Sequence, residues 1–352
     1  MNKISSQERS SLIRLASSLP AGDENRKVIL AGLVEAAADF NTRKHILDNA
    51  QVSGKAKVYG NALIQDNALV YGEAKVSGNA WVSENAKVSG SAEVSGEAQV
   101  RGKAQVSMNA VVSDSANVYG SANVYDSAVV SMNARVYGSA LVYDEAKVYG
   151  SALVYDFVKV YGEADVSGKA QVYGNAQVSE WVKVFGAAKV FGNAFIRGGV
   201  KVFDNAQVSG NAQVYEFVKV YGDAQVSGKT VMYGHAEVYG HAQVSGNAVV
   251  SWDAKVFDNA KVYDNARVTG DTQVSENAQV FGKAEVNDEA KVFGNAQVFS
   301  NAKVFGKAQV FGNAQVFGNA VIGGTAIILG GKWSGSEGEI LSGKWTAPGV
   351  PA

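Results

Sequence analysis

The residues that could perform chemistry in this chain are few and far apart. Its 352 residues include three histidines, His45, His235 and His241, and no cysteine, which excludes thiolate nucleophiles, thiolate metal sites and disulfides. A histidine that acts as a general base must lie within hydrogen-bonding distance of its substrate, and it usually lies in a pocket that adjusts its pKa. His235 and His241 are therefore weak catalytic candidates, and the elements around them decide whether a pocket can form.

The acidic residues point to turns rather than to a metal site. Asp126 and Asp144 lie 18 residues apart and recur in equivalent contexts. Calcium takes about six to eight oxygen ligands, so two carboxylates fall short of a site. Aspartate suits bends because its side chain hydrogen-bonds to nearby backbone. We expect no metal and no cofactor.

A six-residue repeat must position all of these side chains. From Ile46 to Ile328 every sixth residue is aliphatic, giving 48 positions of which 42 are valine, and 41 of the 47 positions two residues earlier are alanine. In an extended segment, residues two apart point to the same side. The hexad ends mostly in Gly or Asp and then a polar residue, which suits a sharp corner. Each hexad is therefore predicted to form a short strand and a corner around a narrow interior.

A second period indicates how many hexads make one coil. The segments "EWVKVFG", "GGVKVFD" and "EFVKVYG" begin at Glu180, Gly198 and Glu216 and share Val in place of Ala followed by Lys. Their spacing of 18 residues predicts three strands per coil, hence 16 coils from the 48 hexads. At roughly 4.8 Å between neighbouring strands the rod would be about 75 Å long.

The phrases "VYGNAQV", "VSGNAWV" and "VFGNAQV" resemble the hexapeptide repeat of left-handed parallel β-helix proteins, a superfamily that includes many acyltransferases. The resemblance covers about residues 46–329. It implies an all-β triangular prism with a left-handed coil, and homotrimers, which are common in that family. It also implies acyl-CoA-dependent acyl transfer, with a histidine beside a cofactor cleft between subunits and commonly a loop that interrupts the repeat.

The chain departs from that enzymatic pattern. No loop interrupts the register between Ile46 and Ile328, and His235 and His241 fall at two different convex corners. Convex corners offer no pocket, so the enzymatic interpretation needs a cleft between protomers. We therefore favour a protein that is not an enzyme, and keep the acyltransferase as the alternative.

Fifteen tyrosines and ten phenylalanines occupy the outer position directly after an inward aliphatic residue. Spacings of 18 predict ladders such as Tyr119 to Phe191 and Phe185 to Phe257, which either stabilise the strands or bind protomers or sugars. Near the end of the repeat, phenylalanines occur on all three faces; we expect this collar to be badly exposed in a monomer and to form an interface. Its members are Phe281, Phe293, Phe299, Phe305, Phe311 and Phe317.

A second candidate contact lies where the repeat departs from its pattern. Trp181, Gly199 and Phe217 share one corner column, and an adjacent outer column holds three lysines. The lysines are Lys183, Lys201 and Lys219. A cluster of this kind is either a packing contact with a neighbouring chain or a ligand patch.

The chain divides into three parts. Residues 1–44 read as two helices around a Leu19–Gly22 turn, forming a cap or docking element with a faint resemblance to hairpins of phage-type structural proteins. Residues 45–330 form the hexapeptide-repeat solenoid. Residues 331–352 form a cap or tail in which Trp333 and Trp345 cover the last coil.

These features favour a non-enzymatic rod that is a structural or binding component of an oligomeric assembly. We expect a homo-oligomer, first a trimer, that joins a larger protein assembly through residues 1–44; a glycan-binding or adhesive spike is a second alternative. The net charge of −1 disfavours nucleic acid, and the absence of a signal peptide or an apolar run of about 18 residues disfavours export or a membrane. The expected location is the cytoplasm, a virion or another assembled particle.

Overall fold

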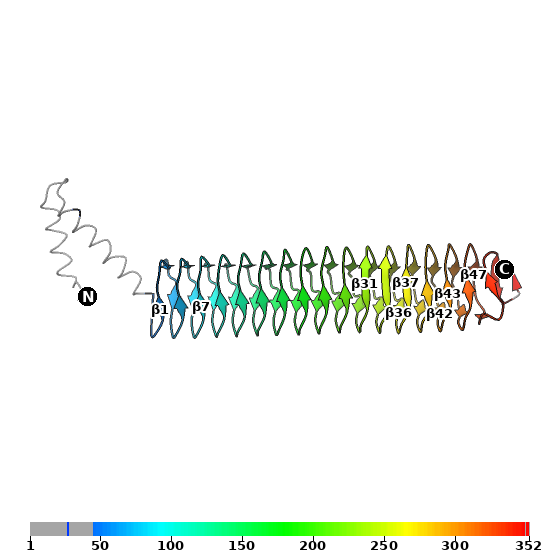
Figure 1. The fold of residues 1–352 in the computed structure, drawn as a ribbon, viewed down its shortest axis with the longest axis horizontal. Coiled ribbons are helices and arrows are strands. Elements are labelled where there is room, and N and C mark those ends of the chain that lie inside the picture. The colour runs from blue at the N-terminus through cyan, green and yellow to red at the C-terminus, as the bar shows by residue number, and fades with distance from the viewer. Residues whose placement is uncertain (1–26, 28–44, 349, 352) are drawn as a thin grey trace.

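The computed structural model describes residues 45–348, together with Lys27, Val350 and Pro351. The helical hairpin expected over residues 1–44 lies, apart from Lys27, outside these residues. Within them the chain forms one long rod of stacked coils (Figure 1).

The strands follow the hexad without a slip. β1 (Gln51–Val52), β2 (Lys57–Val58) and β3 (Leu63–Ile64) begin six residues apart, and the series continues to β47 (Ile327–Ile328). Each strand begins one residue before the inward aliphatic residue. Almost all are two residues long; the exceptions within the series are β31 (Val231–Gly234), β34 (Val249–Trp252) and β37 (Arg267–Thr269).

Each strand from β1 to β47 pairs in parallel with the strand three places further along the chain. β1 pairs with β4 (Leu69–Val70) in the register Gln51↔Leu69 and Val52↔Val70, a separation of 18 residues. This pairing sorts the strands into three sheets: sheet 1 contains β1, β4 and so on, sheet 2 contains β2, β5 and so on, and sheet 3 contains β3, β6 and so on. The predicted coil of three strands is therefore confirmed, whereas its handedness stays an expectation from the resemblance.

The core is a single column of Val and Ala enclosed by the three sheets. Side chains such as Val184 and Ala188 are fully buried, as are nearly all their equivalents. Each inward side chain packs against its counterparts one coil before and after, as Val184 does between Val166 and Val202. Stability therefore accumulates between neighbouring coils, as in other stacked repeats.

The corners require a backbone conformation that favours glycine. The first corner residue has a positive φ, such as 71° at Gly150 and 57° at Asp144. Where aspartate occupies this position, its carboxylate accepts a hydrogen bond from the corner amide one coil further on: Gly162 N–H donates to Asp144 Oδ2 at 3.0 Å. The predicted role of Asp126 and Asp144 as corner residues is confirmed, but the bonded backbone belongs to the next coil.

The segment after residue 330 forms another coil, shorter than the rest. β48 (Lys332–Trp333), β49 (Glu339–Ile340) and β50 (Lys344–Ala347) pair with β45 (Gln315–Val316), β46 (Val321–Ile322) and β47. Trp333 takes the inward position and is 1% exposed, and Trp345 packs against the same core. β51 (Val350–Pro351) then turns back antiparallel to β50, so the expected covering tryptophans belong to a coil of their own.

Candidate functional site

The outer aromatic residues form the predicted ladders. From Tyr119 to Phe191 on sheet 3, successive ring centroids are 4.8–5.0 Å apart and the planes are within 3° of parallel. The ladder from Phe185 to Phe257 on sheet 2 has the same geometry. The rings therefore cover one another's faces, and mainly their edges meet the solvent.

This stacking changes the chemistry of the tyrosines. Tyr143 lies between Tyr125 and Tyr161 in a third ladder, on sheet 1, with centroids 5.0 Å from each. Burial of its hydroxyl, with smaller contributions from the two neighbouring tyrosines and from Asp144 and Asp126, raises the pKa of Tyr143 to about 12. The ladder favours the uncharged phenol.

The phenylalanine collar is less exposed than the sequence suggested. Phe281, Phe299 and Phe317 stack in one column with centroids 4.9 and 5.2 Å apart, and Phe293 stacks on Phe311 at 4.5 Å. All six collar rings, on three faces as expected, are half-buried. The expectation that they would be badly exposed is wrong, because each ring packs against its counterpart one coil away or, for Phe305, over Gly323.

Three strongly exposed aromatic side chains lie on the corner between sheets 1 and 2. Trp181, Phe217 and Trp252 are 59%, 56% and 62% exposed. The ring of Phe217 lies over Gly199 on one side and stacks on His235 on the other, with ring centroids 5.2 Å apart. We call Trp181, Phe217, His235 and Trp252 the aromatic edge. The structure thus brings Phe217 and Gly199 together as expected and adds His235.

The three lysines form the expected column beside this edge. Lys183, Lys201 and Lys219 are aligned on consecutive strands of sheet 2. Lys219 Nζ lies 2.9 Å from Glu237 Oε1, and the Tyr221 hydroxyl donates to Glu237 Oε2 at 3.2 Å. Partial burial alone would raise the pKa of Glu237, but the hydrogen bond and charge of Lys219 outweigh it and lower that pKa. The positive charge of this column is thus partly neutralised at Lys219.

The histidines do not form one site. His235 lies on the aromatic edge, whereas His241 lies on the corner between sheets 2 and 3, where its Nδ1 is 3.5 Å from Asp223 Oδ2. Both members of that pair are exposed. His45 is buried at the start of the rod. Within the described part of the chain, no group of three or more His, Cys, Asp or Glu could hold a metal ion.

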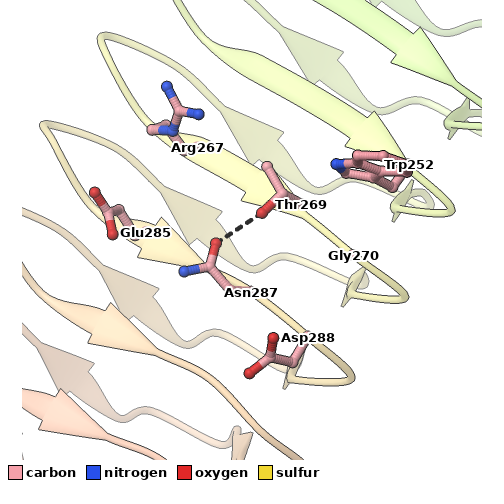
Figure 2. A pocket seen from close by; sticks show the side chains of 7 residues that line it. All are labelled: Trp252, Arg267, Thr269, Gly270, Glu285, Asn287 and Asp288. Atoms are coloured by element: carbon pink, nitrogen blue, oxygen red, sulfur yellow. Dashed lines mark hydrogen bonds between the residues drawn. The ribbon is translucent and has the colours of Figure 1, made fainter.

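A depression interrupts the regular surface on sheet 1 (Figure 2). The outer column of this sheet holds Tyr233 and then, at steps of 18, Ser251, Thr269 and Asn287 before Phe305. Thr269 and Asn287 leave a gap between the rings of Tyr233 and Phe305, whereas Ser251 is itself fully buried. The resulting open hollow has a volume of about 770 Å³ and is lined by Trp252, Arg267, Thr269, Gly270, Glu285, Asn287 and Asp288. We call it the Trp252 depression.

The side chains of the Trp252 depression come from three consecutive coils. Figure 2 shows Arg267 and Glu285 at the starts of their strands and Thr269 and Asn287 two residues further along the chain. Trp252 and Asp288 lie at the corner. Thr269 Oγ1 donates to Asn287 Oδ1 at 2.7 Å. Sequence reasoning missed this site, although the 18-residue period would have aligned Trp252 with Gly234 and Gly270 and shown its unusual place at a corner.

A second hollow, of about 470 Å³, is lined by Glu73, Lys75, Ser91, Glu93, Asn109 and Val111. Lys75 Nζ lies 2.5 Å from Glu93 Oε1, and this hydrogen bond raises the pKa of Lys75. Its lining contains no aromatic ring. An ion pair of the chain itself therefore forms part of the lining of this hollow.

Comparison with known proteins agrees with this architecture. A family model described as the YdcK beta solenoid repeat matches residues 56–72, 260–276 and 308–324. The chain is a parallel β-solenoid. A search of curated proteins found no match. No helix within the described residues is long and apolar enough to cross a membrane. The matched repeats describe the fold of the solenoid and do not identify an activity.

Proposed function

We propose that this solenoid is a non-enzymatic rod that serves as a structural or binding component of an oligomeric assembly. The observation that carries the proposal is the part of the aromatic edge at Trp181 and Phe217, whose side chains are 59% and 56% exposed. Grouped exposed apolar side chains typically mark contact surfaces.

The partner we propose for Trp181 and Phe217 is another copy of this chain. The hexapeptide-repeat proteins that the sequence resembles commonly form trimers, and the edge follows the rod axis, as a contact between aligned rods requires. Trp and Tyr side chains are frequent anchors of such interfaces, with Arg. The neighbouring Lys183 and Lys201 would set the rim of the contact and its salt dependence.

Light scattering of the full-length protein tests this proposal. A double variant, Trp181→Ser with Phe217→Ser, is expected to shift the mass from a trimer toward a monomer. Phe157→Ser is the matched control, because Phe157 is 68% exposed but lies on the corner between sheets 3 and 1. A wild-type monomer, or equal dissociation of both variants, would contradict the aromatic edge as interface.

Attachment to a larger assembly, such as a virion, is the second part of the proposal and concerns residues 1–44. A chain lacking these residues is compared with the intact chain by light scattering. Retained self-association of the shortened rod would assign assembly to the rod, whereas its loss would assign assembly to residues 1–44.

The acyltransferase alternative has one observation in its favour, the contact between His241 and Asp223. A carboxylate can orient a histidine for general-base catalysis. Both side chains are exposed on a convex corner, so only a cleft between protomers would complete the site. Acyl-CoA consumption that is lost in His241→Ala, with the oligomeric mass unchanged, would favour this alternative.

A further inference from the structure

The aromatic ladders and the aromatic edge differ in what they offer a ligand. In the ladders each ring face is covered by the ring one coil away, at 4.8–5.0 Å. Trp252 is 62% exposed and meets Tyr233 only edge-on, at 6.4 Å and 66°. One coil further on, Gly270 has no side chain. The indole therefore keeps an uncovered apolar surface beside the depression.

The floor next to this indole is polar and contains both donors and acceptors. Asn287 Oδ1 accepts from Thr269, which leaves the Asn287 amide hydrogens for another partner. Arg267 and Glu285 are aligned on adjacent strands and add a guanidinium and a carboxylate. Figure 2 shows these groups on neighbouring coils along one side of the hollow.

We propose that the Trp252 depression binds a neutral pyranose unit of a glycan. A sugar ring presents an apolar C–H face that packs on an aromatic ring and hydroxyl groups that both donate and accept hydrogen bonds. The depression offers the Trp252 indole to the apolar face of the sugar, and Thr, Asn, Arg and Glu side chains to its hydroxyl groups. Ligand sites commonly combine apolar walls with a few such polar groups.

The charges around the hollow disfavour charged ligands. Glu285 Oε2 lies 3.6 Å from Lys303 Nζ, and Arg267 adds a further positive charge. The positive charges of Lys303 and Arg267 repel a small cation, which would also have only one aromatic ring to contact. Glu285 and Asp288 oppose a phosphate or sulfate. A neutral ligand with many hydroxyl groups satisfies both signs of charge.

The backbone of Trp252 adopts the conformation common to the corners of the rod. Its φ of 63° lies in the left-handed region, where the equivalent positions one coil away are Gly234 and Gly270. A bulky residue is disfavoured there, although Met108 and Met132 adopt the same φ, 59°, at other corners. The three strands that extend beyond two residues in the regular series, β31, β34 and β37, all lie at this point.

The test uses the full-length protein and an array of neutral oligosaccharides ending in glucose, galactose, mannose or N-acetylglucosamine. Binding to at least one glycan is expected, followed by affinity measurement with that glycan. Trp252→Gly introduces the residue usual at this corner, so the rod should melt at the same or a higher temperature while affinity falls by at least about tenfold. Asn287→Phe refills the gap with the ring found at Phe305 and should also abolish binding.

Phe157→Ser is the matched control, since Phe157 is 68% exposed but lies on the corner between sheets 3 and 1, away from the depression. It should retain glycan affinity. Lack of binding to every neutral glycan, or binding that survives both Trp252→Gly and Asn287→Phe, overturns the proposal. Binding of choline in preference to neutral glycans also overturns it, because the site would then recognise cations.

Discussion

Two buried threonines offer a direct test of how the narrow core treats polar groups. Thr230 and Thr272 replace alanine in the inward column, and both are fully buried. Thr230 Oγ1 donates to the Ser227 carbonyl at 2.6 Å, whereas the Thr272 hydroxyl has no partner in the described part of the chain. Valine already fits fully buried in this column at Val158 and Val200. The substitution to valine therefore exchanges a hydroxyl for a methyl at a tolerated size.

The expected effects of the two substitutions differ in magnitude. Leaving a buried hydroxyl unpaired costs about 1–3 kcal/mol, and burying a methyl group contributes about 0.8 kcal/mol. Thr272→Val should therefore stabilise its coil by about 2 kcal/mol. Thr230→Val loses a hydrogen bond with a net contribution of about 1 kcal/mol, which the methyl group nearly offsets. It should change stability by less than about 1 kcal/mol, toward destabilisation.

Hydrogen exchange of single amides is the appropriate assay, because stacked repeats unfold locally rather than as one unit. The amide of Lys255 donates to the Thr272 carbonyl at 2.9 Å and reports on that coil, and the amide of Gln213 reports on Thr230 at 2.8 Å. Slower exchange at Lys255 in Thr272→Val, with little change or faster exchange at Gln213 in Thr230→Val, is expected. Equal shifts in the two variants would refute the unpaired hydroxyl.

Three further predictions concern the core, the corners and the ladders. Val184→Asp puts a carboxylate in a fully buried position, at a cost of several kcal/mol, and should prevent folding; soluble protein with wild-type melting by circular dichroism would contradict the inward assignment. Asp144→Ala should destabilise its coil by about 1–2 kcal/mol, because alanine disfavours a φ of 57° and cannot accept the hydrogen bond from Gly162. Asp144→Asn should change the stability of the coil by less than about 0.5 kcal/mol. Equal amide exchange rates in the two variants would argue against this corner mechanism. The folded-state pKa of Tyr143, about 12, exceeds its unfolded value of about 10. The contribution of Tyr143 to stability is therefore complete below pH 10 and is lost as the pH rises toward 12. Phenolate absorbance should appear at higher pH in the native protein than in denaturant, and coincident titrations would count against the buried ladder.

The sequence allowed the architecture to be predicted because one simple rule is repeated without interruption. Val and Ala at fixed positions of the hexad determine which side chains point inward, and departures such as Val182, Val200 and Val218 reveal the coil length. The ladders followed from the same 18-residue step. Residue type and period alone were sufficient for these features.

Other features depend on contacts that the period does not encode. The coil containing Trp333 has spacings of 17 and 18 residues and no hexad, so the sequence suggested only a tail. The burial of Phe299 follows from the close stacking of rings, which residue counts cannot provide. The Trp252 depression arises where Thr269 and Asn287 lie between Tyr233 and Phe305 in one outer column, an arrangement that is visible only once neighbouring coils are aligned.

Because the register of 18 residues is constant, the position of a residue along the rod is proportional to its residue number. Each coil advances the chain by one strand spacing, about 4.8 Å, and returns every side chain to the same face. Inserting one further copy of 18 residues would therefore lengthen the distance between Trp181 and Trp252 by that step and leave both on the same edge. Inserting six residues would instead rotate everything downstream by one third of a turn, moving Trp252 to a neighbouring edge. In this molecule, residue number translates directly into both height and direction.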